Sequence, residues 1–518
     1  MEEKTMKQNN IFKLLLMGAG LLFLNACSNL IPVENPIEEI IANQETRIEV
    51  LGLRTETDTK VTLTGATYAW KKGDTIAVWT GTDAEHYGTA GGYQKCIVAA
   101  DGSLPVTLAA GYERYNYALY PANIMYAGGK ADFTPTGLMV VLPKTYSYDD
   151  VCGDNVQQPM IAFNDRTKSN LTFYNLASIL RLEVTLPKRT VKLKIKFNPD
   201  CMVNGRYYVT PTSVVPGTAC IDSSQVFDGS NVISITGIHD IPVSDSTIIV
   251  NVPIPVDQVN EGYNDFSISA WDDAGKAIKA ELVHMASDYN PARGHGKQLK
   301  ITLTQGTFKI SDSKYCIVSP SNLMYDGTKP ARSRYVFHDN AKDVCTPPAE
   351  YKENSTYDQF YWLSASDDWG NNNVISSYKK KTWNTPEKSQ WEKIITYSNH
   401  IHVPAKIDDV KGFIILPIGY SGPAVVVEQG NNKSYDNNPL TNTAWAEYAA
   451  AGAMFLPERD GVSGETAELG NHKYWSSTSE DKDDAYCCVI SGLTLHANST
   501  DYADKDTRRC FVRLIHIL

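Results

Sequence analysis

A tryptophan set among acidic and amide side chains gives the clearest ligand-binding signal in this chain. Trp369 lies within residues 366–373, SDDWGNNN, where the polar surroundings favour an exposed indole ring that can stack on a sugar or a peptide. Trp475 can stack in the same way, but aromatic side chains of strands mostly bury, so we expect it in a core. The sequence therefore predicts a binding site for a glycan or protein ligand of a host or neighbouring cell at Trp369, Asp367, Asp368 and Asn371.

Residues 480–484, EDKDD, bring several carboxylates together. Calcium needs several converging oxygen ligands, which this run can partly supply. Such a run more often forms a solvated loop. We therefore expect no cofactor, and calcium binding stays open without a supporting motif.

No group of catalytic residues is evident in the sequence. The cysteines form no paired CxxC motifs and no Cys/His spacing of a zinc site. No Ser/His/Asp set or Gly-rich phosphate loop stands out. We expect no enzymatic activity; turnover that disappears on substituting the adjacent Cys487 or Cys488 would indicate the alternative.

The N-terminal residues indicate export. A short cationic stretch precedes the apolar run Leu14–Leu24, which is about half the ~20 residues needed to span a bilayer. Cys27 follows directly after Leu24, Asn25 and Ala26, a pattern that resembles the bacterial lipobox, whose cysteine is acylated after cleavage in front of it. Acyl chains anchor a protein because each buried methylene contributes about 0.8 kcal/mol. We expect a signal peptide over 1–26, lipid on Cys27, and an outer-membrane lipoprotein exposed at the cell surface.

Composition limits the class of partner. The chain has 518 residues and a net charge of −11, which argues against nucleic-acid binding because that normally needs a basic face. With Cys27 acylated, nine cysteines are left, so they cannot all pair within one chain. Cys201 with Cys220, and Cys510 with Cys487 or Cys488, can form disulfides in an exported protein, and buried thiols are an equal alternative.

Short strands with alternating polarity dominate residues 45–305. Leu193, Ile195 and Phe197 alternate with lysines, which places apolar side chains on one face and ammonium groups on the other. Gly-, Pro-, Asn- and Asp-rich turns at short spacing separate such segments, as in β-sandwiches. The fold class is therefore mainly β. We expect a tether over 27–44, a first β-sandwich over 45–186 and a second over 187–305.

The last third, residues 306–518, reads as an α+β domain. Residues 389–392, SQWE, form a capping-box pattern before a helix whose apolar side carries Trp391. Thr443–Ala451 predicts a second helix, with Gly452 as a suitable residue to end it.

Four segments of the first two thirds resemble the Bacteroidales fimbrillin-like proteins. Members of that family are pilus subunits, and the resemblance implies two transthyretin-like β-sandwich domains. The segments are GATYAWKKGDTIAV at 65–78, YNYALYP at 115–121, LTFYNLASIL at 171–180 and PARGHGKQL at 291–299.

The C-terminal part resembles the Fibrobacter/Bacteroidetes major paralogous domain. The matching segments are AGAMFLP at 451–457, YWSST at 474–478 and CFVRL at 510–514. This resemblance implies a C-type-lectin-like fold over 306–518. The formylglycine-generating enzymes have a related fold, but Cys487 and Cys488 do not match their redox-active pair.

The fimbrillin resemblance implies assembly by strand exchange. In that family an N-terminal strand is removed after an arginine, and the C-terminal strand of another subunit fills the groove by β-augmentation. Here Ile48–Leu53 is the candidate strand, Arg54 the preferred cleavage site and Arg47 the second choice. Because Arg513–Leu518 is expected to be a paired core strand, the chain has no strand to donate, which favours a pilus tip adhesin. The alternative is a permanently anchored glycan- or protein-binding lipoprotein that does not polymerise.

Overall fold

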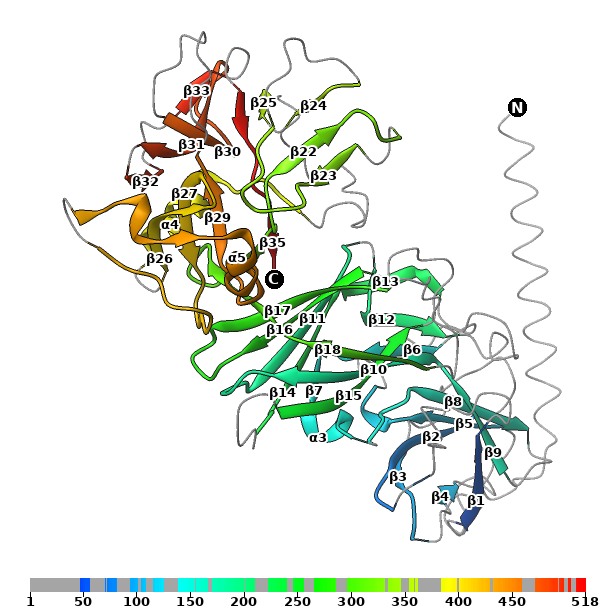
Figure 1. Ribbon diagram of the computed structural model, residues 1–518. Coiled ribbons are helices and arrows are strands. Elements are labelled where there is room, and N and C mark those ends of the chain that lie inside the picture. The colour runs from blue at the N-terminus through cyan, green and yellow to red at the C-terminus, as the bar shows by residue number, and fades with distance from the viewer. Residues whose placement is uncertain are drawn as a thin grey trace, which may run out of the picture.

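The computed structural model is mainly β, as expected from the alternating polarity of the sequence. Figure 1 shows three successive modules along the chain, with the C-terminus between the second and the third. The structure describes residues 47–55, 70, 72–81, 94–100, 104–108, 115–124, 138–153, 155–165, 170–199, 201–209, 222–239, 246–255, 265–285, 296–330, 334–345, 354–357, 359–361, 383–397, 400–428, 432–458, 471–491, 493–497, 502–504 and 509–518. Among these residues, no helix is long and apolar enough to cross a membrane.

The first module is built on a seven-stranded sheet in the order β3-β2-β5-β8-β9-β1-β4. The two end strands lie against each other, so the sheet curls around its own core. In that core Trp70 packs edge-on against Tyr120 and Phe173, with ring centroids 5.2 and 4.8 Å away. The strands are β1 (Arg47–Thr55), β2 (Thr75–Gly81), β3 (Gln94–Ile97), β4 (Leu104–Leu108), β5 (Tyr115–Tyr120), β8 (Met160–Asp165) and β9 (Asn170–Asn175).

The second module is a β-sandwich of two facing sheets, β15-β10-β18 and β19-β17-β16-β11-β14-β7. Leu193, Ile195 and Phe197 point into the core between the sheets, which confirms the alternation expected for this strand. The strands are β7 (Thr145–Ser147), β10 (Ala177–Leu186), β11 (Lys192–Phe197), β14 (Val232–Thr236), β15 (Ser246–Pro255), β16 (Asp265–Trp271), β17 (Ala277–His284), β18 (Gly296–Thr302) and β19 (Gln305–Gly306).

The core of this sandwich extends to both sides of the expected division after Leu186. Tyr146 of β7 and Val151 of the short helix α3 (Tyr148–Val151) belong to the same buried cluster as the apolar side chains of β10 and β11. A further three-stranded sheet in the order β13-β12-β6 joins β6 (Leu138–Leu142) to β12 (Asn204–Val209) and β13 (Asp222–Ser230). The pairing and packing of residues 138–186 thus tie them to the second module as well.

The C-terminal module combines four small sheets with two helices. Their orders are β20-β21-β35, β23-β22-β24, β25-β34-β30-β31-β32 with β33 on β31, and β28-β26-β27-β29. The elements are β20 (Phe308–Lys309), β21 (Tyr315–Val318), β22 (Leu323–Asp326), β23 (Tyr335–Phe337), β24 (Thr356–Tyr357), β25 (Gln359–Tyr361), α4 (Lys388–Thr396), β26 (Ile401–Ile407), β27 (Val410–Leu416), β28 (Pro439–Leu440), α5 (Asn442–Ala450), β29 (Met454–Pro457), β30 (Asn471–Ser479), β31 (Asp484–Ser491), β32 (Thr494–His496), β33 (Tyr502–Asp504), β34 (Arg509–Phe511) and β35 (Ile515–Ile517).

Both expected helices are present, with one correction. The capping box of α4 uses Glu387 and Gln390, not Ser389 and Glu392, because the helix begins at Lys388. Trp391 of α4 is buried as expected. Helix α5 is followed by Gly452 at φ +88°, a left-handed conformation that favours glycine.

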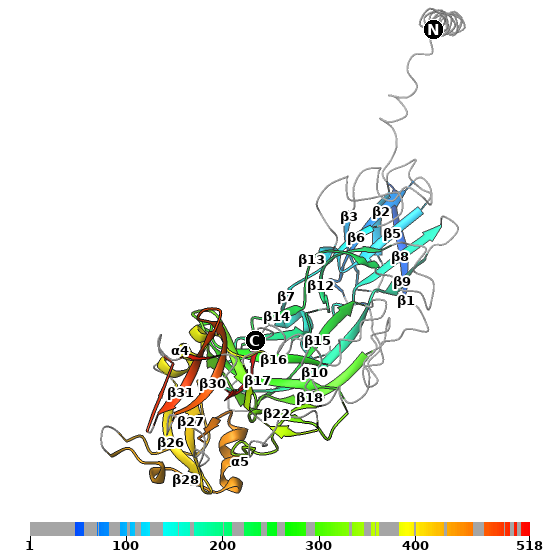
Figure 2. The same cartoon turned by 90° about the horizontal axis from the view of Figure 1, so that it is seen from above.

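The C-terminal module packs on the outer face of the six-stranded sheet of the sandwich. Trp271 and Ala280 of that sheet share a buried cluster with Tyr315, Ile317 and Leu518 of the C-terminal module. Figure 2 shows the C-terminus beside β16 and β17 at this contact. The sheet face that carries the lysines of β11 is therefore partly covered by the C-terminal module.

Candidate functional site

In the part of the chain that the structure describes, strand β1 is paired on one side only along each half of its length. Residues 47–51 pair antiparallel with β4, and residues 52–55 pair parallel with β9. By comparison, residues 179–185 of β10 pair with β15 and β18 at the same time. β1 is not the outermost strand, because β4 lies beyond it, but each of its residues has a single ladder partner among the residues that the structure describes. Its removal would leave the Asn170–Phe173 segment of β9 without that neighbour.

The two candidate cleavage residues lie at opposite ends of β1. Arg47 is the first residue of the strand and pairs with Leu108, whereas Arg54 pairs with Thr172 one residue before the strand ends. Hydrolysis after Arg54 would separate all but Thr55 of the strand from the rest of the chain. Hydrolysis after Arg47 would leave almost the whole strand attached to the rest of the chain.

The C-terminal tail is held by side chains in three separate cores. Leu514 belongs to the cluster around Trp475, Ile515 to the cluster around Trp391, and Leu518 to the cluster at the junction with the sandwich. β35 pairs antiparallel with β21, from Ile515 opposite Val318 to Ile517 opposite Cys316. These contacts confirm the expected paired core strand at the end of the chain.

Arg513 fixes the start of this tail from inside the module. Arg513 is 1% exposed, and its guanidinium donates hydrogen bonds to the Asn322 side-chain oxygen at 3.3 Å and to the Pro320 carbonyl at 3.1 Å. Burial lowers the pKa of Arg513 to about 10, since the charged form loses its hydration. The next residue is also fixed, because the Leu514 amide donates to the Ser319 hydroxyl and its carbonyl accepts from the Ser319 amide.

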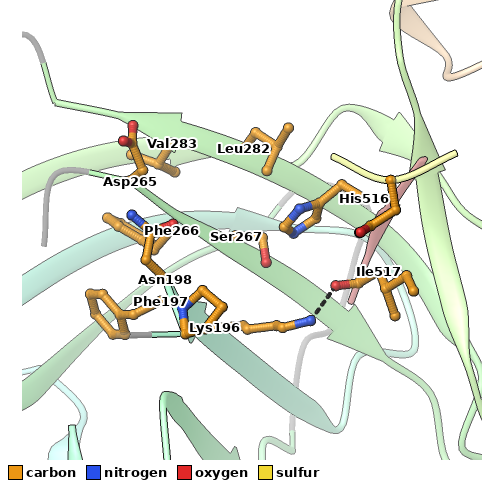
Figure 3. Close-up of a pocket in the computed structure, with 12 residues that line it drawn as sticks. Lys196, Phe197, Asn198, Asp265, Phe266, Ser267, Leu282, Val283, His516 and Ile517 are labelled. Atoms are coloured by element: carbon orange, nitrogen blue, oxygen red, sulfur yellow. Dashed lines mark hydrogen bonds between the residues drawn. The ribbon is translucent and has the colours of Figure 1, made fainter. Parts of the chain in front are cut away.

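A cavity of about 160 Å³ lies where the C-terminal module meets the sandwich. Its apolar lining comes from Phe197, Phe266, Leu282 and Val283 of the sandwich. Its polar lining includes Lys196, Asp265 and Ser267 from the sandwich and Asn384 and His516 from the C-terminal module. Figure 3 shows the Ser267 hydroxyl between the His516 ring and the Lys196 side chain in this view.

Lys196 is the positive charge of the cavity. Its ammonium group donates a hydrogen bond to the Ile517 carbonyl at 2.5 Å (Figure 3). Burial, and to a smaller extent the neighbouring Lys194 and Lys314 ammonium groups, together lower the pKa of Lys196 to about 8. Within the described part of the chain, no carboxylate forms an ion pair with Lys196. The other end of the cavity differs, because Asp265 already has the His284 ring at 2.6 Å.

Sequence reasoning did not find this cavity. The alternating lysines of β11 were correctly assigned to the face opposite the core, but nothing local showed that another module covers that face. The only signal was the repeated positive charge itself.

The expected ligand-binding residues Trp369, Asp367, Asp368 and Asn371 lie outside the described residues, as does Cys27. The structure therefore leaves these predictions as they stand. Tyr474 and Trp475 are both buried, which confirms that Trp475 belongs to a core.

The acidic run at 480–484 forms a turn with its own hydrogen bonds. The Asp481 carboxylate accepts the backbone amides of Asp483 and Asp484 at 2.7 and 2.8 Å. Among the described residues, no group of three or more His, Cys, Asp or Glu side chains is arranged to hold a metal ion. The described cysteines also form no disulfide, so Cys510 is not joined to Cys487 or Cys488.

Comparisons with known proteins give structural likenesses at low sequence identity. No protein-family model matches the chain, and no curated protein matches it. A fimbrial protein from Bacteroides ovatus is similar at 11% identity and a TM-score of 0.24, over 91% of this chain and 99% of that one. A protein from the same species described as a putative cell adhesion protein is similar at 13% identity and a TM-score of 0.30, over 50% of this chain and 93% of that one.

A third similar structure comes from Bacteroides thetaiotaomicron and is described as belonging to putative polysaccharide binding proteins. It shows 11% identity and a TM-score of 0.28, over 52% of this chain and 94% of that one. At these identities and TM-scores the likeness assigns no ligand, partner or assembly to this chain.

Proposed function

We propose that this protein is an adhesin at the tip of a pilus. It is exported as a lipoprotein acylated on Cys27 and loses β1 by hydrolysis after Arg54. It then accepts the donor strand of another subunit in the vacated place. Its C-terminal module binds a ligand on a host or neighbouring cell.

The observation that carries this proposal is the difference between the two ends of the chain. Within the described residues, β1 has one ladder partner per residue, whereas the tail places Leu514, Ile515 and Leu518 in three cores. A strand held on one side can be replaced by another strand that makes the same main-chain hydrogen bonds. A chain that can accept a strand but cannot release its own tail ends a filament.

Arginine-specific proteolysis of the folded protein tests the acceptor half of the proposal. We expect a product that begins at Thr55 and keeps the rest of the chain intact. A fluorescent peptide with the sequence of residues 48–54, IEVLGLR, should then bind the cut protein and not the uncut one. Arg54→Ala should abolish both the cut and the peptide binding.

Arg47→Ala is the matched control, since it changes the other arginine of the same strand and should leave both results unchanged. If the protein is cut after Arg54 but the peptide does not take the place of β1, the proposal is contradicted. That result would favour the permanently anchored lipoprotein, as would full-length acylated protein on mature cells.

A further inference from the structure

The cavity at the junction has the size of a small ring. Its volume of about 160 Å³ is close to the roughly 150 Å³ of an engineered apolar cavity that holds benzene. Leu282 lines it on the sheet face that also carries Lys196 and Ser267, whereas the Phe197 and Phe266 rings, with centroids 5.2 Å apart, lie in the sandwich core behind that face. Leu282 gives the cavity an apolar wall against which a compact ligand can pack.

The charge at one end of the cavity selects an anionic group. An ammonium group has three donors and no acceptor, and Lys196 uses one donor on the Ile517 carbonyl. Its immediate neighbours Lys194 and Lys314 add positive charge, and no described carboxylate pairs with it. Ser267 supplies a hydroxyl at the same end (Figure 3). A carboxylate there would meet charge-assisted hydrogen bonds, which are the stronger kind.

We propose that this junction cavity binds a small ring-shaped carboxylate, with the acid group on Lys196 and the ring against Leu282. Because the lining comes from both the sandwich and the C-terminal module, the bound ligand contacts both modules. This site is independent of strand exchange at β1 and of the pilus assignment.

Binding measured by calorimetry on the full mature chain tests the proposal with two acids and their neutral counterparts. Benzoate stands for an aromatic acid and glucuronate for an acidic sugar; benzamide and methyl glucoside lack the charge. At least one acid should bind at least tenfold more tightly than its neutral counterpart. Binding of benzoate alone, or of glucuronate alone, identifies the source of the carboxylate. Neither acid binding at millimolar concentration overturns the proposal.

Substitutions on β11 locate the binding site. Lys196→Met should weaken binding of the acid about tenfold or more, and Lys196→Arg, which keeps the charge, should largely retain it. Lys192→Met is the matched control, because Lys192 lies on the same face of the same strand but does not line the cavity. Equal losses in Lys192→Met and Lys196→Met, or no loss in Lys196→Met, would overturn the assignment.

The pH dependence of acid binding separates a direct role of Lys196 from a merely structural one, which would not change with the charge of Lys196. Binding should weaken as the pH rises through about 8, because Lys196 then loses the proton that attracts the acid. The charged or titratable groups that face or neighbour it are Lys194, Lys314, His516 and Asp265. Affinity that does not change between pH 6.5 and 9.5 would contradict the role of Lys196.

Discussion

Substitutions in the tail, residues 513–518, should destabilise the C-terminal module of the isolated, unassembled protein. Leu514 and Ile515 are each 1% exposed, and they enter two different cores. Truncating such a side chain to alanine costs about 2–5 kcal/mol, from the lost burial and the cavity left behind. Withdrawing Leu514, Ile515 and Leu518 together would cost about 5–9 kcal/mol at roughly 1.5–3 kcal/mol each. That loss is comparable with the whole stability of a domain, about 5–15 kcal/mol.

Chemical unfolding followed by tryptophan fluorescence is the suitable assay, since six of the nine tryptophans lie after residue 305. Leu514→Ala and Ile515→Ala should each lower the free energy of unfolding of this module by at least 2 kcal/mol. Ile401→Ala is the matched control: Ile401 is 42% exposed on β26, so its truncation should cost less than about 0.5 kcal/mol. If both tail variants are as stable as the control and only association between chains weakens, the tail is a donor strand and the reasoning is wrong.

Two further results are expected from the same module and its neighbour. The His400 ring donates to the Ile394 carbonyl and accepts from the Lys309 amide, and burial lowers the pKa of His400 to about 4. Because the unfolded chain takes up this proton near pH 6.5, up to about 3 kcal/mol of stability should be lost as the pH falls from 6.5 to 4; an NMR titration in which His400 protonates near 6.5 would refute this. Thermal unfolding should show a clearly larger loss of stability for Gly452→Ala than for Gly275→Ala. The loss for Gly275→Ala should be about 1–2 kcal/mol. Both glycines have positive φ, but only at Gly452 would a Cβ approach a backbone nitrogen to 2.0 Å, and equal losses would contradict this.

The sequence was sufficient to predict features that depend on residues close to one another along the chain. The period of two in residues 192–197 identifies a strand and its core face because side chains alternate across a sheet. Apolar residues in the last positions likewise predicted a paired tail, which is β35. The capping box of α4 was predicted two residues too late, because the helix uses Glu387 and Gln390 instead of Ser389 and Glu392.

Features that join distant segments could not be read from local pattern. Lys196 and the Ile517 carbonyl that accepts its hydrogen bond are 321 positions apart. The lysine face of β11 was expected to be polar, and only the packing of the C-terminal module turns part of it into a cavity wall. The exchange of partners along β1, from β4 to β9, also depends on paired residues that are at least 53 positions apart in the sequence.

Hydrogen–deuterium exchange of the intact folded protein compares the two ends of the chain in one measurement. If β1 can leave its sheet and the tail cannot leave its module, the amides of residues 47–55 should exchange by local opening. They should do so at least tenfold faster than those of residues 514–518, which should exchange only when the C-terminal module unfolds. Equal protection of both segments, or faster exchange in the tail, would contradict a chain that accepts a strand and has none to donate.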